Sequence, residues 1–135
     1  MFEKRKLMAC ALITPLFLTA CAGGSQSFLA IFQPPQIIWN DTSWCTPIGL
    51  KIALNKISRK FGPIKVHSTH RWPLENARKG GKKRSFHLSC RAVDFAVPGK
   101  PSEVKAFLRS LHEVGGYSYY SKGFYHIDNG PRRTW

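Results

Sequence analysis

The sequence predicts one α+β domain, in which a small antiparallel sheet is flanked by helices. Segments whose apolar residues repeat at helical spacing alternate with short segments rich in β-branched and aromatic residues. These segments do not form regular strand–helix–strand units, which favours α+β over a parallel α/β sheet. The 135 residues, 43% of them hydrophobic, suffice for one domain with a modest core.

The first predicted helix begins after Thr46-Pro47, because a threonine followed by proline is typical of a helix start. Gly62 is a suitable place for this helix to end. Its apolar side chains repeat at roughly helical spacing: Ile48, Ile52, Ile57 and Phe61. Residues 64–68 then predict a strand, and a polar loop follows over residues 69–84.

A second strand and a second helix follow this loop. Residues 92–97 predict the strand, and residues 98–99 its turn. Ser102 is expected to cap the helix, which should end at residues 115–116, a pair of glycines. One face of this helix is apolar: Val104, Phe107, Leu108 and Leu111.

A hairpin is expected to close the fold. Residues 117–120 and 124–128 predict its two strands, and residues 121–123 its turn. Because side chains alternate across a strand, three residues of the last strand share one face. They are Phe124, His126 and Asp128.

Residues 1–20 are interpreted as an export signal, because a short charged start precedes an apolar stretch too short to span a bilayer comfortably. Residues 18–21, Leu-Thr-Ala-Cys, resemble the lipobox of bacterial lipoproteins. The resemblance implies cleavage before Cys21 and lipid on its thiol. An ordinary secretory signal and an uncleaved anchor are the alternatives. Ala22 follows the cysteine, and resemblance to sorting rules of some bacteria then favours the outer membrane.

On this interpretation the domain lies on the periplasmic side of a bacterial membrane. Residues 21–44 contain Gly, Ser, Gln and two adjacent prolines and are expected to form a tether. Trp39 and Trp44 are expected to dock the end of this tether onto the domain, which comprises residues 45–135. We expect the protein to be a monomer.

The chain is strongly basic, with 21 Lys and Arg against 7 Asp and Glu and a formal net charge of +14. This balance favours anionic partners such as nucleic acid, acidic lipid headgroups or cell-wall polymers. Nucleic acid fits an exported lipoprotein poorly, so we expect none. A basic surface that is merely solvated is the simpler alternative.

The cysteines predict a disulfide. Cys10 leaves with the signal and Cys21 carries the lipid, which leaves Cys45 and Cys90 in an oxidising compartment. Closing a loop of this length stabilises a fold by about 3–4 kcal/mol on the chain-entropy account.

Three residues could hold a metal ion: His87, Asp94 and His126. A catalytic zinc site needs three protein ligands and one open position. On one helix His87 and Asp94 would lie about 10 Å apart along the axis, too far for one ion, so a turn must separate them. His126 lies in a strand, whereas His67 and His112 are interpreted as ordinary strand and surface residues.

Several segments, in order, resemble the zinc D-Ala-D-Ala carboxypeptidases and murein endopeptidases of the hedgehog-type peptidase fold. The closing GPRRTW, residues 130–135, is most similar to the murein endopeptidase K branch. The resemblance covers roughly residues 45–135. The matching positions are Ser68-x-x-Arg71, Asn76, Gly80-Gly81, Ser85-x-His87, Ala92-x-Asp94 and His126-x-Asp128-x-Gly130.

The resemblance implies a zinc ion held by His87, Asp94 and His126, in an enzyme that cleaves stem-peptide or crosslink bonds of peptidoglycan. It also implies that Arg71 binds a substrate carboxylate or the developing oxyanion. Ser85 is expected to contact substrate or to cap a turn. Asn76 is expected to lie near the substrate, where it is more suited to shaping the loop than to taking part in the reaction.

Two positions depart from the family pattern. Cys90 stands where many members have glycine, and Gly123 stands where several members have an acidic general base. Among the remaining carboxylates, Asp128 is expected either to serve as the base or to orient a histidine ligand. His70 is a further acid–base candidate.

These observations favour a zinc endopeptidase over a zinc carboxypeptidase because of the C-terminal resemblance. The alternative is a zinc-containing lipoprotein that binds peptidoglycan without cleaving it, which the missing acidic residue at Gly123 motivates. A secreted nuclease with a His/Asp metal site ranks last, since no motif order supports it.

Overall fold

The computed structural model describes residues 34–135. The export signal at residues 1–20, the lipid attachment at Cys21 and the tether up to residue 33 lie outside the described residues. Among residues 34–135, no helix is long and apolar enough to cross a membrane.

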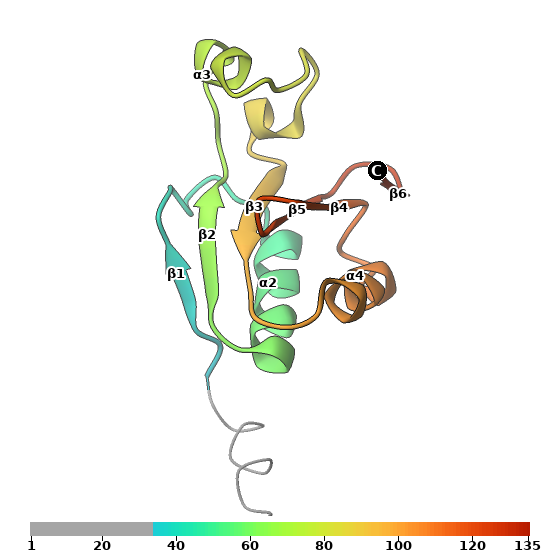
Figure 1. Cartoon of the computed structure of the whole chain (residues 1–135). Helices are drawn as coiled ribbons and strands as arrows, with labels where there is room; N and C mark the ends of the chain where they lie inside the picture. The colour runs from blue at the N-terminus through green and yellow to red at the C-terminus, as the bar shows by residue number, and fades with distance from the viewer. Residues whose placement is uncertain (1–33) are drawn as a thin grey trace, which may run out of the picture.

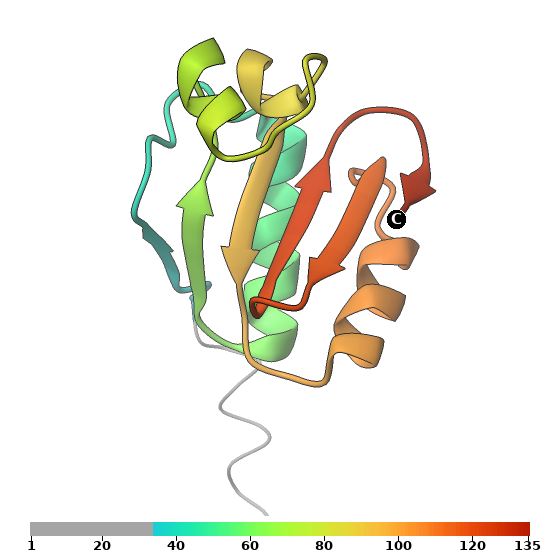
Figure 2. The same cartoon turned by 45° about the horizontal axis from the view of Figure 1, so that its top comes forward.

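The domain is built on one six-stranded sheet with the strand order β1-β2-β3-β5-β4-β6 (Figures 1 and 2). The strands are β1 Ile37–Trp39, β2 Ile64–Ser68, β3 Ala92–Ala96, β4 Gly116–Tyr120, β5 Phe124–Asp128 and β6 Arg133–Thr134. The four central strands pair antiparallel, as predicted. Both edge strands pair parallel to their neighbours, which the sequence did not predict.

Two longer helices, α2 (Ile48–Phe61) and α4 (Pro101–Ser110), pack on one face of the sheet (Figure 2). The shorter α3 (Pro73–Arg78) and the 3₁₀ helix η1 (Phe86–Ser89) lie together beyond one end of β2 and β3 (Figure 1). This arrangement confirms the α+β class. It also places the loops between β2 and β3 at one end of the sheet.

Helix α2 spans the predicted residues, and the predicted apolar stripe is buried in part. Its core side chains are Leu50, Ala53, Leu54 and Ile57, all fully buried. Of the residues predicted to form the stripe, Ile57 is buried and Phe61 packs against the core, whereas Ile48 and Ile52 are exposed.

The strands agree closely with the sequence predictions, while other elements differ. Helix α3 lies inside the segment predicted as loop, and its start at Pro73 is typical of the first helical turn. Helix α4 begins at Pro101 without a side-chain cap from Ser102, and it ends at Ser110, before the glycines. Ring packing against the core confirms the docking of Trp39, whereas Trp44 is 82% exposed.

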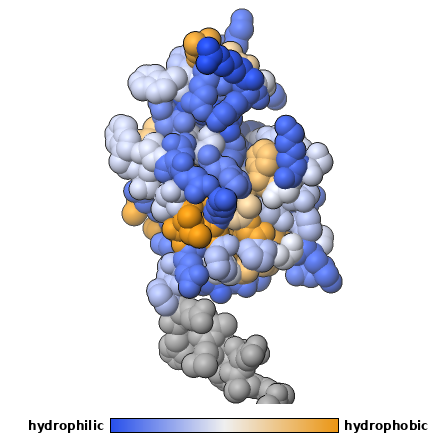
Figure 3. Space-filling model, turned by 60° about the vertical axis from the view of Figure 1, so that its left-hand side comes forward, coloured by the Kyte–Doolittle hydropathy of each residue, from blue (hydrophilic) through white to orange (hydrophobic). Residues whose placement is uncertain are grey.

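Outside the core the surface is mainly polar. Figure 3 shows that hydrophilic residues cover most of one side of the molecule and that hydrophobic patches only interrupt them. This fits the excess of Lys and Arg in the sequence. The buried hydrophobic side chains gather instead between the sheet and the two longer helices.

Candidate metal centre

Strand pairing brings Asp94 and His126 side by side. The two residues are direct partners in the antiparallel pair β3–β5, so their side chains leave the sheet on the same face. Both are buried. An interior strand pair is a rigid support, and it fixes the relative position of the carboxylate and the imidazole.

The turn before β3 brings His87 to the same place. The Ser85 hydroxyl caps η1 by accepting a hydrogen bond from the backbone N–H of His87 at 3.4 Å. Cys90 ends η1 in the left-handed conformation, with φ of 57°, which explains why glycine suits this position. The predicted disulfide is present and ties Cys90 to Cys45, with Cα atoms 5.7 Å apart.

Three ligand-type atoms therefore converge. His126 Nδ1 lies 2.8 Å from Asp94 Oδ1, His87 Nε2 lies 3.1 Å from the same oxygen, and the two nitrogens are 3.3 Å apart. Zinc bonds of about 2.0–2.1 Å in a tetrahedron would separate two ligand atoms by about 3.3 Å. The triangle is thus close to the size that a zinc ion requires.

The outer hydrogen bonds of the two histidines strengthen this fit. His87 Nδ1 lies 2.7 Å from the carbonyl oxygen of Thr69, and His126 Nε2 lies 3.0 Å from Asp128 Oδ2. Each outer nitrogen must donate, so in the neutral rings both inner nitrogens carry lone pairs. Two lone pairs then face the oxygen of Asp94 with no hydrogen between them, and a cation would satisfy all three atoms.

The electrostatics of the buried group agree with this arrangement. Burial alone would raise the pKa of Asp94, but hydrogen bonds from His126 and His87, which form when these rings are protonated, outweigh it and hold the pKa well below the usual range. Burial alone would lower the pKa of His126, and its hydrogen bonds to Asp128 and Asp94 outweigh it and raise the pKa. The carboxylate is therefore ionised and able to bind a cation.

Arg71 lies against the other oxygen of Asp94. Its Nη2 forms an ion pair with Asp94 Oδ2, and its Nε donates to the Ser68 hydroxyl at 2.9 Å. The guanidinium thus orients the carboxylate, a role that the sequence did not predict. Arg71 also lines the pocket, so the substrate or oxyanion contact predicted for it stays a prediction.

Asp128 lies behind His126 and not in the pocket. Its side chain is fully buried, and Oδ1 accepts hydrogen bonds from the backbone N–H groups of Gly116 and Gly130. Arg133 Nη2 lies 2.6 Å from Oδ2, which also receives His126. Burial would raise the pKa, but hydrogen bonds from His126 and Arg133 lower it to about 2.

These contacts favour one of the two alternatives for Asp128. A general base must reach the reacting water, and a buried carboxylate with both oxygens occupied cannot. Orientation of His126 is the role that the geometry favours, and a catalytic base at Asp128 stays a prediction. Arg133, which holds Asp128, was missed, although it belongs to the closing GPRRTW segment.

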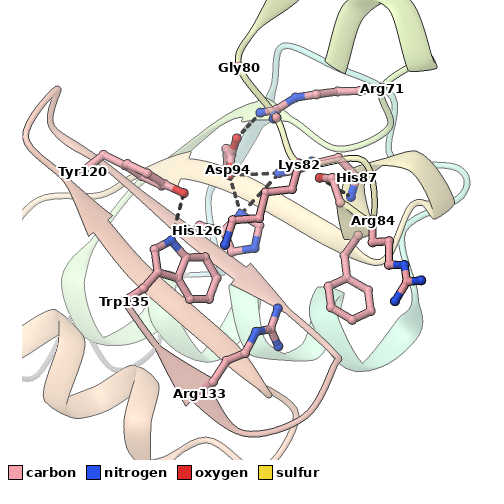
Figure 4. A pocket seen from close by; sticks show the side chains of 13 residues that line it. Arg71, Gly80, Lys82, Arg84, His87, Asp94, Tyr120, His126, Arg133 and Trp135 are labelled. Atoms are coloured by element: carbon pink, nitrogen blue, oxygen red, sulfur yellow. Dashed lines mark hydrogen bonds and ion pairs between the residues drawn. The ribbon is translucent and has the colours of Figure 1, made fainter. Parts of the chain in front are cut away.

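The three converging atoms open into a pocket of about 500 Å³ (Figure 4). Among residues 34–135, Asp94 is the single carboxylate that lines it. The lining residues are Arg71, Gly80, Gly81, Lys82, Arg84, Ser85, Phe86, His87, Asp94, Tyr120, His126, Arg133 and Trp135. A basic pocket around a carboxylate–histidine cluster suits an anionic ligand.

The remaining candidates lie outside this lining. Asn76 is 3% exposed, and its Nδ2 donates to the carbonyl of Lys82 at 2.9 Å, so it shapes the loop and does not face a ligand. The ring of His70 packs against Trp72. Gly123 lies at the turn between β4 and β5, with φ of 88°, and brings no side chain to the site.

Comparisons with known proteins agree with the geometry. The sequence model of the family described as Peptidase M15 matches residues 36–128. A segment of 59 residues is 42% identical to the probable peptidoglycan L,D-endopeptidase MepK of Haemophilus influenzae, and covers 42% of this chain and 31% of that protein. A segment of 64 residues is 36% identical to the peptidoglycan L,D-endopeptidase MepK of Escherichia coli K12, and covers 46% and 35%.

The chain thus spans about a third of the length of the curated relatives that it matches. The family match is broader, because it covers most of the described residues and includes all three residues of the metal centre. The family resemblance predicted from the sequence is confirmed, and the chain belongs to the Peptidase M15 family.

Proposed function

We propose that this protein is a zinc-dependent peptidase that cleaves stem-peptide or crosslink bonds of bacterial peptidoglycan. Endopeptidase activity is favoured over carboxypeptidase activity. The observation that carries the proposal is the convergence of His87, Asp94 and His126 at the base of an open pocket. The family match and the names of the relatives, both peptidoglycan endopeptidases, support the substrate class.

The donor set suits zinc better than calcium or magnesium. Two imidazole nitrogens and one carboxylate oxygen are typical of catalytic zinc sites, whereas calcium and magnesium prefer oxygen ligands. When bound, zinc supplies a Lewis acid that activates water and polarises a carbonyl group. His87 and His126 would hold the ion through Nε2 and Nδ1, and Asp94 through Oδ1.

Other side chains of the pocket would position the substrate. Arg71 uses Nη2 and Nε within the protein, so its Nη1 is the nitrogen left to donate to a carboxylate or to a developing oxyanion. The Tyr120 hydroxyl accepts a hydrogen bond from Trp135 Nε1 at 3.3 Å and can still donate its own proton. Both groups would hold the scissile bond against the metal centre.

A second candidate function is binding of peptidoglycan without cleavage. The pocket, as far as residues 34–135 describe it, offers no carboxylate besides Asp94 to accept a proton from water. Gly123 stands where related peptidases carry an acid, and Asp128 is buried away from the pocket. A protein that retains the metal but lacks the base would bind stem peptides and release them intact.

One digestion experiment separates the two functions. Purified peptidoglycan is incubated with the zinc-loaded protein, and the soluble fragments are identified by mass spectrometry. The peptidase proposal expects new fragments that disappear with a chelator and with His126→Ala, and their masses would name the bond. Intact peptidoglycan that nevertheless retains the zinc-loaded protein would support the binding function instead.

We also propose that the domain is held by lipid on Cys21 at the periplasmic side of a membrane, with the outer membrane favoured. The support is the Leu-Thr-Ala-Cys segment at residues 18–21. Mass spectrometry of the N-terminal peptide from membrane fractions tests this. A peptide that begins at Cys21 with added fatty acyl mass is expected, and an unmodified Cys21 in a soluble fraction would contradict it.

A further inference from the structure

The cations of the pocket fall into two groups. Arg71 is paired with Asp94, and Arg133 is paired with Asp128, so both are used within the protein. Lys82 and Arg84 also line the pocket, and neither forms an ion pair within residues 34–135. Both side chains are exposed, and Figure 4 shows both among the side chains that surround the metal centre.

The loop that carries these two cations is fixed by a buried side chain. The side-chain Nδ2 of Asn76 donates to the backbone carbonyl of Lys82 at 2.9 Å, and the backbone N–H of Gly81 donates to the backbone carbonyl of Asn76 at 2.8 Å. A Cβ atom at Gly81 would lie 2.1 Å from Asn76 Oδ1. The loop is therefore seated on Asn76, and only glycine fits at its closest approach.

A second hydrogen bond holds the end of the loop, since the backbone N–H of Ser85 donates to the carbonyl of Lys82 at 3.0 Å. Ser85 in turn caps η1, which carries His87. The loop is thus joined to the metal centre through a few residues of continuous, hydrogen-bonded backbone. The backbone from which Lys82 and Arg84 extend therefore keeps a defined position relative to the three converging atoms.

The opposite side of the pocket is different in character. Tyr120 and Trp135 lie there, joined by the hydrogen bond between Trp135 Nε1 and the Tyr120 hydroxyl, and Arg84 lies across from them (Figure 4). The Trp135 ring lies 5.2 Å from the ring of His126. Tyr120 and Trp135 thus form an aromatic side of the pocket, where Arg133 also lies 5.1 Å from the Trp135 ring, and Arg84 lies on the opposite side of the metal centre.

We propose that Lys82 and Arg84 form a carboxylate subsite, positioned by Asn76, which selects peptides that carry a free carboxylate beside the bond at the metal centre. This inference rests on the proposed peptidase function and names the substrate class of the same site. Two cations without an internal partner are available for an anion, and the aromatic side suits the uncharged part of the peptide. The subsite would fix the direction in which the peptide lies across the metal.

The test uses two synthetic stem peptides that differ only in carrying free carboxylates or carboxamides. Their binding to the zinc-loaded protein is measured by calorimetry, and mass spectrometry after the titration checks that the peptides are intact. The carboxylate peptide is expected to bind about tenfold more tightly, because charge-assisted hydrogen bonds are the stronger kind. The difference is expected to shrink as salt is added, since both cations are exposed.

Three variants test which residues give the preference for the carboxylate peptide. Lys82→Gln with Arg84→Gln is expected to reduce the preference to about twofold or less. Lys65→Gln with Lys105→Gln removes the same charge from exposed residues outside the pocket and is the matched control. Asn76→Ala is expected to lower the preference while zinc content stays unchanged, which identifies a positioning residue.

The outcomes separate this inference from the proposed function. A carboxylate preference that the pocket pair removes and the control pair keeps supports the subsite, even if neither peptide is ever cleaved. Loss of preference in both pairs would show only the overall charge, and it would overturn the subsite. Full preference in Lys82→Gln with Arg84→Gln would overturn it too, and cleavage of peptidoglycan by that variant would leave the peptidase standing.

Discussion

The floor of the pocket, formed by His87, Asp94 and His126, differs from the loop that carries Lys82 and Arg84 in how its charges are paired. Asp94 on the floor and Asp128 behind it each have an arginine partner, and both are held by strands in the interior of the sheet. In the loop, Lys82 and Arg84 are exposed and have no such partner among the described residues. This difference indicates that ion pairs within the protein fix the geometry of the metal centre, whereas cations without such a partner stay available to a ligand.

Zinc binding at the floor of the pocket is expected to be lost when one of the three ligand residues is removed. His87→Ala leaves two protein ligands, so zinc content should fall from one ion per chain to nearly none, and hydrolysis of peptidoglycan should be lost. Metal analysis of the purified protein and fragment counting measure both effects. His112→Ala, an exposed histidine just after α4, is the control and should keep both.

The crosslink beside the floor is expected to have the next largest effect. Replacing both Cys45 and Cys90 by alanine should lower the free energy of unfolding by about 3–4 kcal/mol, because the unfolded chain gains freedom. Cys45→Ala with Cys90→Gly should recover about 1 kcal/mol of that, since Cys90 is left-handed. Denaturant unfolding measures both, and equal stability of the two double variants would contradict the backbone argument.

The carboxylate behind His126 is expected to act on zinc affinity. Asp128→Asn keeps the shape but weakens the acceptor of the imidazole N–H, so zinc affinity should fall by about 10- to 100-fold. Titration against a chelator measures this, with Glu103→Gln on α4 as the control. Unchanged zinc affinity together with slower hydrolysis would return Asp128 to the role of general base.

The smallest effect is expected in the loop. Gly81→Ala would place a Cβ atom against Asn76 and shift the loop, so the preference for the carboxylate peptide should fall by about two- to fivefold while zinc content holds. Gly49→Ala in α2, where the added atom has room, is the control. Loss of zinc in Gly81→Ala would mean that floor and loop are not separate.

The sequence predicted the sheet strands well because they combine clear local patterns. Residues 64–68 and 124–128 are strands in the structure as predicted, bounded by turn residues. The two edge strands were missed, since Ile37–Trp39 and Arg133–Thr134 are too short for periodicity to appear. In α2, Ile57 is buried as predicted but Ile48 and Ile52 are exposed, because the exact face that meets the sheet is set by tertiary packing.

The candidate site shows the same division. The residues that converge, His87, Asp94 and His126, were predicted from family motifs and chemistry, and the structure brings them together. Asp128 was one expected partner of a histidine ligand, but two further partners were not predicted. The carbonyl of Thr69 is backbone, and Arg133 reaches Asp128 only through the final strand. Hydrogen-bond partners of this kind depend on three-dimensional packing and leave no spacing signal.

One zinc ion is expected to bind His87, Asp94 and His126, and diffraction recorded at the zinc absorption edge tests this most directly. A single anomalous peak is expected about 2.0–2.2 Å from His87 Nε2, His126 Nδ1 and Asp94 Oδ1. A folded, zinc-saturated protein with no peak at these atoms, or with a peak elsewhere, would contradict it.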